Sequence, residues 1–175
     1  MANITQETAN KLASVCGAVA VSRYSDKNWC YDSLARLRNA GLKFRNIHIL
    51  VSSETIPWIL ETFEDFHSDE RLFGTTAIVL LSLKKKGRGT GFTRCTEEEF
   101  EMIVDKAMKM KIPFGMDSCS AHKAMAALKK YPEYDQIKDM IEPCESSLAS
   151  AYLNAEGMYF PCSFTEGTEG WTPVS

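Results

Sequence analysis

The stretch TAIVLLSL (Thr76–Leu83) is the most apolar run of the 175-residue sequence. Its β-branched and leucine side chains follow one another without polar alternation, which is typical of a buried strand in a parallel sheet. The run is far too short to cross a bilayer. A glycine-rich basic loop, KKKGRGTG (Lys84–Gly91), follows it directly. Thr76–Leu83 therefore predicts a strand whose C-terminal end opens into a flexible loop.

Three further apolar runs repeat this pattern, and a segment with helical signals fills each gap between runs. The runs are GAVAVS (Gly17–Ser22), NIHILV (Asn46–Val51) and IPFGM (Ile112–Met116). The predicted helices are Asp32–Ala40 ending at Gly41, Ser53–Phe66 with Ser53 as its cap, and a helix through Met108 that opens with a Thr96/Glu99 capping box. This alternation predicts four parallel βα units, with strands buried on both faces.

The expected fold class is α/β, because right-handed crossovers would put the helices on one side of a curved sheet. Four such units make about half of an eight-unit TIM-type barrel. Residues 1–130 are therefore predicted to form a partial βα barrel. Residues 131–175 are predicted to form a small C-terminal extension that carries cysteines and a β-hairpin, with its turn at Asn154–Gly157.

The composition is that of an ordinary globular protein, with 45% apolar and 25% charged residues and a net charge of −3. No basic face dominates, so nucleic acid is not an expected partner. The N-terminal MANITQETANK lacks the pattern of a secretory signal, and no run is long enough for a membrane span. We expect a cytoplasmic protein, in which the six cysteines are free thiols or metal ligands.

Three cysteines fall in the last third of the chain: Cys119, Cys144 and Cys162. Cys119 is predicted to open a helix, where the helix dipole favours the thiolate, and the other two follow prolines in EPC and FPC. His122 lies one helical turn after Cys119. A Cys₃His set suits zinc, and three thiolates suit an iron–sulfur cluster, whereas small buried side chains are the ordinary alternative. The other three cysteines are interpreted as core or helix-end residues.

Polar side chains at the predicted strand ends are candidates for ligand binding. Ser22 and Arg23 end the first strand, and Ser52 ends the second. Arg88 lies in the loop after Thr76–Leu83 and could hold a carboxylate or phosphate. The same residues are equally consistent with a solvated basic loop that binds no ligand. That loop lacks the P-loop order of residues.

With these residues together, the chain resembles the C-terminal half of a radical S-adenosylmethionine (radical SAM) protein, of the kind common in phages and gut bacteria. The resemblance is carried by GAVAVSRY, NIHILVSSET, AIVLLSLKKKGRG, GMDSCSAHK and EPCESSLASAYLNAEGMYFPCSF. Its last segment is similar to the auxiliary-cluster region of the SPASM/twitch type. The resemblance implies that Cys119, Cys144 and Cys162 ligate an auxiliary [4Fe–4S] cluster. It also implies that Ser22 approaches the methionine part of SAM, with Ser52 and Ser82 along the SAM edge of the barrel.

The sequence departs from that family at its catalytic motif. No CxxxCxxC is present, nor the glycine-rich motif that holds the SAM amino group. We therefore expect part of a split or truncated radical SAM enzyme that cannot cleave SAM alone. A complementary N-terminal half, or self-association at the open edge of the first strand, would complete it. The alternative classes are a non-enzymatic zinc-binding module, with His122 as fourth ligand, and an α/β interaction module without metal.

Overall fold

The computed structural model describes residues 4–171 of the chain. Its strands are β1 (Ala18–Arg23), β2 (Phe44–Val51), β3 (Ala77–Ser82), β4 (Phe114–Met116), β5 (Tyr152–Leu153) and β6 (Tyr159–Phe160). Its α-helices are α1 (Gln6–Val15), α2 (Lys27–Asn39), α3 (Ile56–Asp65), α4 (Glu97–Lys109), α5 (Ala121–Leu128) and α6 (Tyr134–Ile137). Short 3₁₀ turns are η1 (Ser53–Thr55), η2 (Glu70–Leu72), η3 (Gly87–Gly91), η4 (Ser118–Ser120) and η5 (Lys138–Met140).

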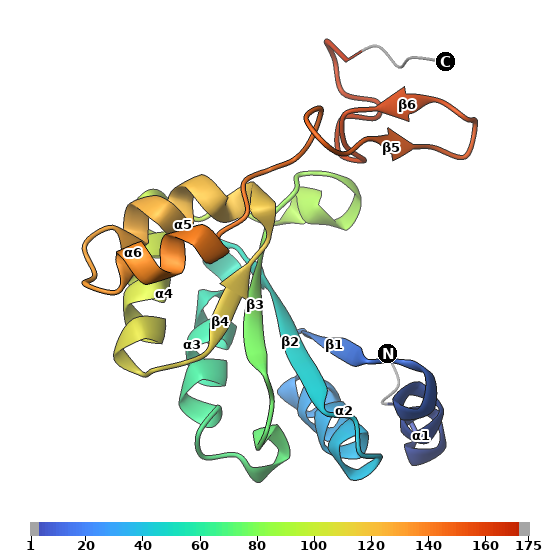
Figure 1. Ribbon diagram of the computed structural model, residues 1–175, viewed down its shortest axis with the longest axis vertical. Coiled ribbons are helices and arrows are strands. Elements are labelled where there is room, and N and C mark those ends of the chain that lie inside the picture. The colour runs from blue at the N-terminus through green and yellow to red at the C-terminus, as the bar shows by residue number, and fades with distance from the viewer. Residues whose placement is uncertain (1–3, 172–175) are drawn as a thin grey trace.

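The first four strands form one parallel sheet in the order β1-β2-β3-β4 (Figure 1). The register pairs Ile47 of β2 with Val21 of β1 and with Ile78 of β3. β4 is short and pairs with β3 over Phe114–Met116. β5 and β6 form a separate antiparallel hairpin. The predicted α/β class, the four parallel strands and the C-terminal hairpin are thus confirmed.

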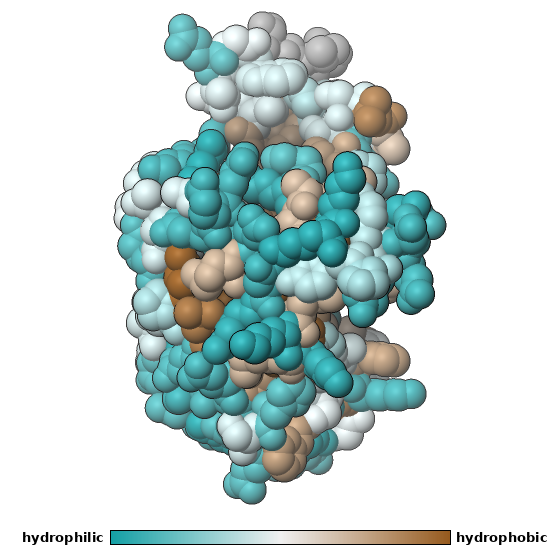
Figure 2. Space-filling view, turned by 90° about the vertical axis from the view of Figure 1, so that its left-hand side faces the viewer, coloured by the Kyte–Doolittle hydropathy of each residue, from teal (hydrophilic) through white to brown (hydrophobic). Residues whose placement is uncertain are grey.

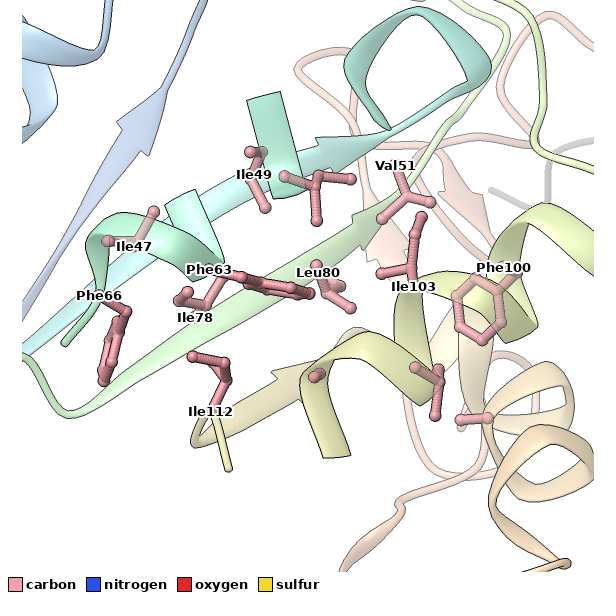
Figure 3. Packing of buried hydrophobic residues seen from close by; sticks show 14 of the residues in the cluster. Ile47, Ile49, Val51, Phe63, Phe66, Ile78, Leu80, Phe100, Ile103 and Ile112 are labelled. Atoms are coloured by element: carbon pink, nitrogen blue, oxygen red, sulfur yellow. The ribbon is translucent and has the colours of Figure 1, made fainter. Parts of the chain in front are cut away.

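One face of the sheet carries the core. Buried side chains from β2 and β3 point toward the helices, where they pack with Phe63 of α3 and Ile103 of α4 (Figure 3). These strand residues are Ile47, Ile49, Val51, Ile78 and Leu80. The helices α2, α3 and α4 all contribute buried residues to this same cluster. Every crossover helix that joins two strands of the sheet therefore packs on one side of it.

The opposite face of the sheet is uncovered within residues 4–171. Along β1, β2 and β3 the burial alternates, so that His48, Leu50, Val79 and Leu81 are only half-buried and Ser22 is exposed. The expectation that the strands are buried on both faces was wrong for this part of the chain. Four strands with all helices on one side leave the second face without a covering layer.

Local capping explains the helix boundaries. Thr96 and Glu99 form the predicted capping box at the start of α4. Gly41 follows α2 with a φ of 84°, in the left-handed region that glycine adopts most readily. The cap before η1 and α3 is Ser52, paired with Thr55, and not Ser53 as predicted. Helix α2 begins earlier than predicted, because Asp26 caps it.

The first helix, α1, was not predicted from the sequence. Thr5 caps it by accepting a hydrogen bond from the Thr8 amide, and Ala9 is fully buried in a small cluster with Leu37 and Leu42. This cluster lies against the C-terminal half of α2, which contains Leu37. Its sequence signal is weak, since only a few apolar residues of α1 face inward.

The C-terminal extension places its hairpin beyond the C-terminal ends of the parallel strands, whereas its helix α6 lies beside α5 (Figure 1). Its hairpin turns at Asn154–Gly157 as predicted: the Gly157 amide donates to the Asn154 carbonyl at 3.1 Å. On the side that carries α5 and α6, the surface is mainly hydrophilic, with several separate apolar areas among the hydrophilic side chains (Figure 2). Among the helices of residues 4–171, none is long and apolar enough to span a membrane.

Candidate functional site

Three cysteines meet at the C-terminal edge of the sheet. Cys119 lies in η4 directly after β4, Cys144 lies between η5 and the hairpin, and Cys162 follows β6. All three line one hollow of about 360 Å³, together with the backbone turns at Pro143 and Pro161. The structure thus brings together three thiols that are far apart in the sequence, and the prolines of EPC and FPC lie beside them.

The thiols of the hollow differ in environment from the other cysteines. Cys119 and Cys144 are exposed and Cys162 is half-buried, and the Phe164 amide lies 3.3 Å from the Cys162 Sγ, to which it donates. Cys30 and Cys95 are buried in the core; burial raises the pKa of Cys30 to about 12 and that of Cys95 to about 11. The thiols at the hollow are therefore accessible to a ligand, and the two core thiols are inert.

His122 does not line this hollow. It lies in the first turn of α5 and faces a neighbouring hollow with Lys123. In the described part of the chain, no three His, Cys, Asp or Glu side chains are close enough together to hold one metal ion. The Cys₃His set predicted as the zinc alternative is accordingly not assembled.

The size of the hollow bears on which group it would hold. Zinc–sulfur bonds of about 2.3 Å in a tetrahedron place two sulfurs about 3.8 Å apart. A four-iron cluster binds each thiolate through a different iron atom, so its cysteines stand further apart than those on one ion. The hollow has about 360 Å³, and its three cysteines form no close trio of the kind that a single ion requires.

A hydrogen-bonded network fixes the strand end that carries Cys119. The Ser82 amide donates to Asp117 Oδ2 at 3.0 Å, and the Ser120 hydroxyl donates to Asp117 Oδ1 at 2.9 Å. The Lys84 ammonium also donates to Asp117. Burial would raise the pKa of Asp117, but the hydrogen bonds from Lys84 and Ser120 outweigh it and hold this pKa below its usual value. Asp117 therefore stays ionised and ties the ends of β3 and β4 together.

The uncovered face of the sheet forms a groove of about 730 Å³ beside the cysteine hollow. Four of the five predicted ligand-binding residues line it: Ser22, Arg23, Ser82 and Arg88. Ser52 does not, because it is fully buried and its hydroxyl is bonded to Thr55. The rest of the groove is largely apolar, with Leu50, Trp58, Leu81 and Phe92 among its walls.

Cys119 and Phe164 line both the groove and the cysteine hollow, so the two spaces adjoin. The Lys84 ammonium lies 5.6 Å from the centre of the Phe164 ring, and the Lys86 ammonium donates to the Glu166 carbonyl. These contacts hold the C-terminal extension against the loop after β3.

The sequence analysis did not identify Asp117 and Lys84 as site residues. Their only signal was a charged residue at the end of an apolar run.

Arg23 is the most unusual charged residue of the groove. Its side chain is fully buried, and its Nη2 donates to Glu61 Oε2 at 2.6 Å. Its Nε and Nη1 have no hydrogen-bond partner among the described residues.

His48 of β2 also lines the groove, on the uncovered face of the sheet. Burial lowers the pKa of His48, so this imidazole is neutral near pH 7.

Fold and site together define an α/β protein with a one-sided parallel sheet and a three-cysteine hollow at the C-terminal ends of its strands. Comparison of the chain with protein-family models, with curated protein sequences and with solved structures found no match.

Proposed function

We propose that this chain is the C-terminal part of a split or truncated radical SAM enzyme, working in the cytoplasm. In this proposal it is a half-barrel that binds an auxiliary [4Fe–4S] cluster and does not cleave SAM alone. The observation that carries the proposal is the meeting of Cys119, Cys144 and Cys162 on one hollow. These are the cysteines that the family resemblance marks as cluster ligands.

The arrangement of the sheet supports the half-barrel. A doubly wound α/β fold has helices on both faces of its sheet, whereas a βα barrel has them only outside. Here the strands follow one another in sequence order, and α2, α3 and α4 pack on the same face. The uncovered face, with its groove, corresponds to the inside of such a barrel.

The residues at the hollow fit the cluster chemically. Thiolates are the ligands that iron–sulfur clusters take, and an amide donor to the Cys162 sulfur is a common way in which proteins tune such sites. When bound, such a cluster stores and passes on a single electron. The protein's own part is to hold the three thiols in place, through the Asp117 network for Cys119 and the hairpin for Cys162.

The groove supports a SAM-facing surface that is completed by a partner. Ser22, Ser82 and Arg88 line the groove at the strand ends, next to Cys119, whereas the buried guanidinium of Arg23 is turned to Glu61 of α3. These 175 residues contain no CxxxCxxC, so the iron site that would reduce SAM has to come from another chain or half. The open face and the free edge of β1 are where we expect a complementary N-terminal half, or a second copy, to bind.

The test is anoxic purification after expression with iron, followed by iron, sulfide and zinc analysis and EPR of the reduced protein. We expect about four irons and four sulfides per chain. Cys119→Ala, Cys144→Ala and Cys162→Ala should each lose most of the iron, whereas Cys16→Ala, at a half-buried thiol outside the hollow, should retain it. Reduced protein mixed with SAM should leave the SAM intact.

Two other results of the metal analysis would contradict the iron–sulfur proposal. About one zinc per chain without iron, lost in His122→Ala, would support the zinc-binding module. Absence of any bound metal would contradict both metal readings and leave the α/β interaction module.

A further inference from the structure

A second hollow, of about 340 Å³, lies on the helix side of the same sheet edge. Four basic side chains line it: Lys84, Arg94, His122 and Lys123. Two hydroxyls, those of Ser82 and Ser120, complete its polar wall. No carboxylate is among the described residues that line it, although the whole chain has a net charge of −3. The hollow is thus a local concentration of positive charge.

Three of these basic groups are available to a ligand. Lys84 is engaged by Asp117, but Arg94, His122 and Lys123 form no hydrogen bond or ion pair with any other side chain in residues 4–171. Carboxylates stand around the hollow without lining it. Asp117 is bonded to Lys84 and to the Ser120 hydroxyl. Glu97 and Glu101 line an adjoining hollow with His122 and Lys123, and Glu101 is paired with Lys130.

The first turn of α5 adds to this charge. His122 and Lys123 lie in that turn, no acidic residue accompanies them, and the cap residue Ser120 makes no capping hydrogen bond. Cations at the positive end of a helix dipole are unfavourable, and an anion bound there relieves them. At the start of α4, by contrast, Thr96 caps the helix and three glutamates follow it.

We propose that this hollow binds the phosphate group of a small phosphate ester. Arg94, Lys123 and His122 would contact the phosphate oxygens as charged or imidazole donors. The hollow is within the size range of small-molecule sites and larger than a free ion requires. Its apolar wall of Val51, Leu83 and Phe100 accommodates the organic part of the ester. The hollow shares one lining residue, Cys119, with the cysteine hollow, but Arg94 and Lys123 line only the former, so phosphate binding can be tested apart from the cluster.

The test uses the 175-residue chain with phenyl phosphate, inorganic phosphate and phenol as probes, titrated by calorimetry at constant ionic strength. We expect phenyl phosphate to bind, inorganic phosphate to bind more weakly, and phenol not to bind. Arg94→Gln and Lys123→Gln should each weaken binding at least about tenfold. Lys129→Gln removes the same charge from the exposed C-terminal end of α5 and should change affinity by less than about twofold.

The competing results are distinct. Binding of inorganic phosphate without phenyl phosphate would overturn the assignment to an ester. Equal loss of affinity in Lys129→Gln would indicate a diffuse charge effect and overturn the site. No heat with either phosphate probe, from a chain that circular dichroism finds folded, would overturn the proposal altogether.

Discussion

The six cysteines of this chain behave as two groups, and the difference is set by burial. Four thiols reach solvent, since Cys119 and Cys144 are exposed and Cys16 and Cys162 are half-buried, whereas Cys30 and Cys95 lie in the core. A thiol reacts through its thiolate, so a buried thiol with a raised pKa is doubly protected. The sequence alone distinguished these groups only by context, through the prolines before Cys144 and Cys162.

We predict that iodoacetamide at pH 8 labels Cys16, Cys119, Cys144 and Cys162 of the folded chain quickly. Cys30 and Cys95, with pKa values raised to about 12 and about 11, should label only after unfolding. Peptide mass mapping over time measures the rates. If the proposed cluster is bound, the three thiols of the hollow become protected while Cys16 stays reactive. Labelling of Cys30 as fast as Cys119 in the native state would contradict this burial pattern.

Arg23 and Glu61 are expected to respond unequally to mutation. Glu61→Ala leaves a fully buried guanidinium without its acceptor, and we expect it to lower the free energy of unfolding by about 2 kcal/mol. Arg23→Met removes a buried cation whose Nε and Nη1 are unpaired, while Glu61 keeps solvent and Lys27 as partners. It should cost less than about 1 kcal/mol. Urea unfolding of both variants measures the difference. Equal losses would contradict this asymmetry.

At the scale of elements, the loop after β3 depends on one close backbone approach. A Cβ on Gly89 would lie 2.1 Å from the Lys84 carbonyl oxygen, whereas one on Gly91 would have no neighbour within 4 Å. The loop carries Arg88 and Lys86, so its shape affects both the groove and the contact with the C-terminal extension.

We predict that Gly89→Ala lowers the free energy of unfolding by about 2 kcal/mol, because backbone atoms have to move. Gly91→Ala, two residues away in the same turn, should change it by less than about 0.5 kcal/mol. Urea denaturation followed by circular dichroism compares the two. A neutral Gly89→Ala would mean that the loop does not pack as described.

Most elements of the sheet could be predicted from local pattern. The Thr96/Glu99 capping box, Gly41 after α2 and the Asn154–Gly157 turn each act through neighbouring residues, and all three were found where predicted. Helix α1 was missed, because its burial depends on packing against α2 and on few apolar residues of its own. The cap Ser52 was misassigned to Ser53, since both serines follow the same strand.

At the scale of the whole molecule, the one-sided sheet is the feature with the largest consequence. Ile78 and Val79 are neighbours on β3, but Ile78 is fully buried under the helices and Val79 faces the uncovered side. An exposed apolar sheet face is a surface that another protein segment can cover. This is the physical basis for expecting a partner or a second copy there.

We predict that Ile78→Ala lowers the free energy of unfolding by about 3 kcal/mol, whereas Val79→Ala lowers it by less than about 1 kcal/mol. Urea unfolding measured at two protein concentrations tests this pair. A large, concentration-dependent cost for Val79→Ala would mean that the face is covered in solution by another copy. Similar concentration-independent losses at both positions would contradict the one-sided sheet.

The sequence by itself determined the strands, most of the helices and the three cysteines worth following, because periodicity, caps and turn residues act over a few neighbours. It did not reveal that only one face of the sheet is covered, because Val79 and Leu81 are as apolar as Ile78 and Leu80 in the same continuous run. Only the tertiary structure decided which distant residues meet at the strand ends: Cys119 with Cys144 and Cys162 at one hollow, and Arg94 with Lys123 at another. Local pattern gives the face on which a side chain lies. The neighbours across that face depend on how the strands are ordered and how the chain returns to the same edge.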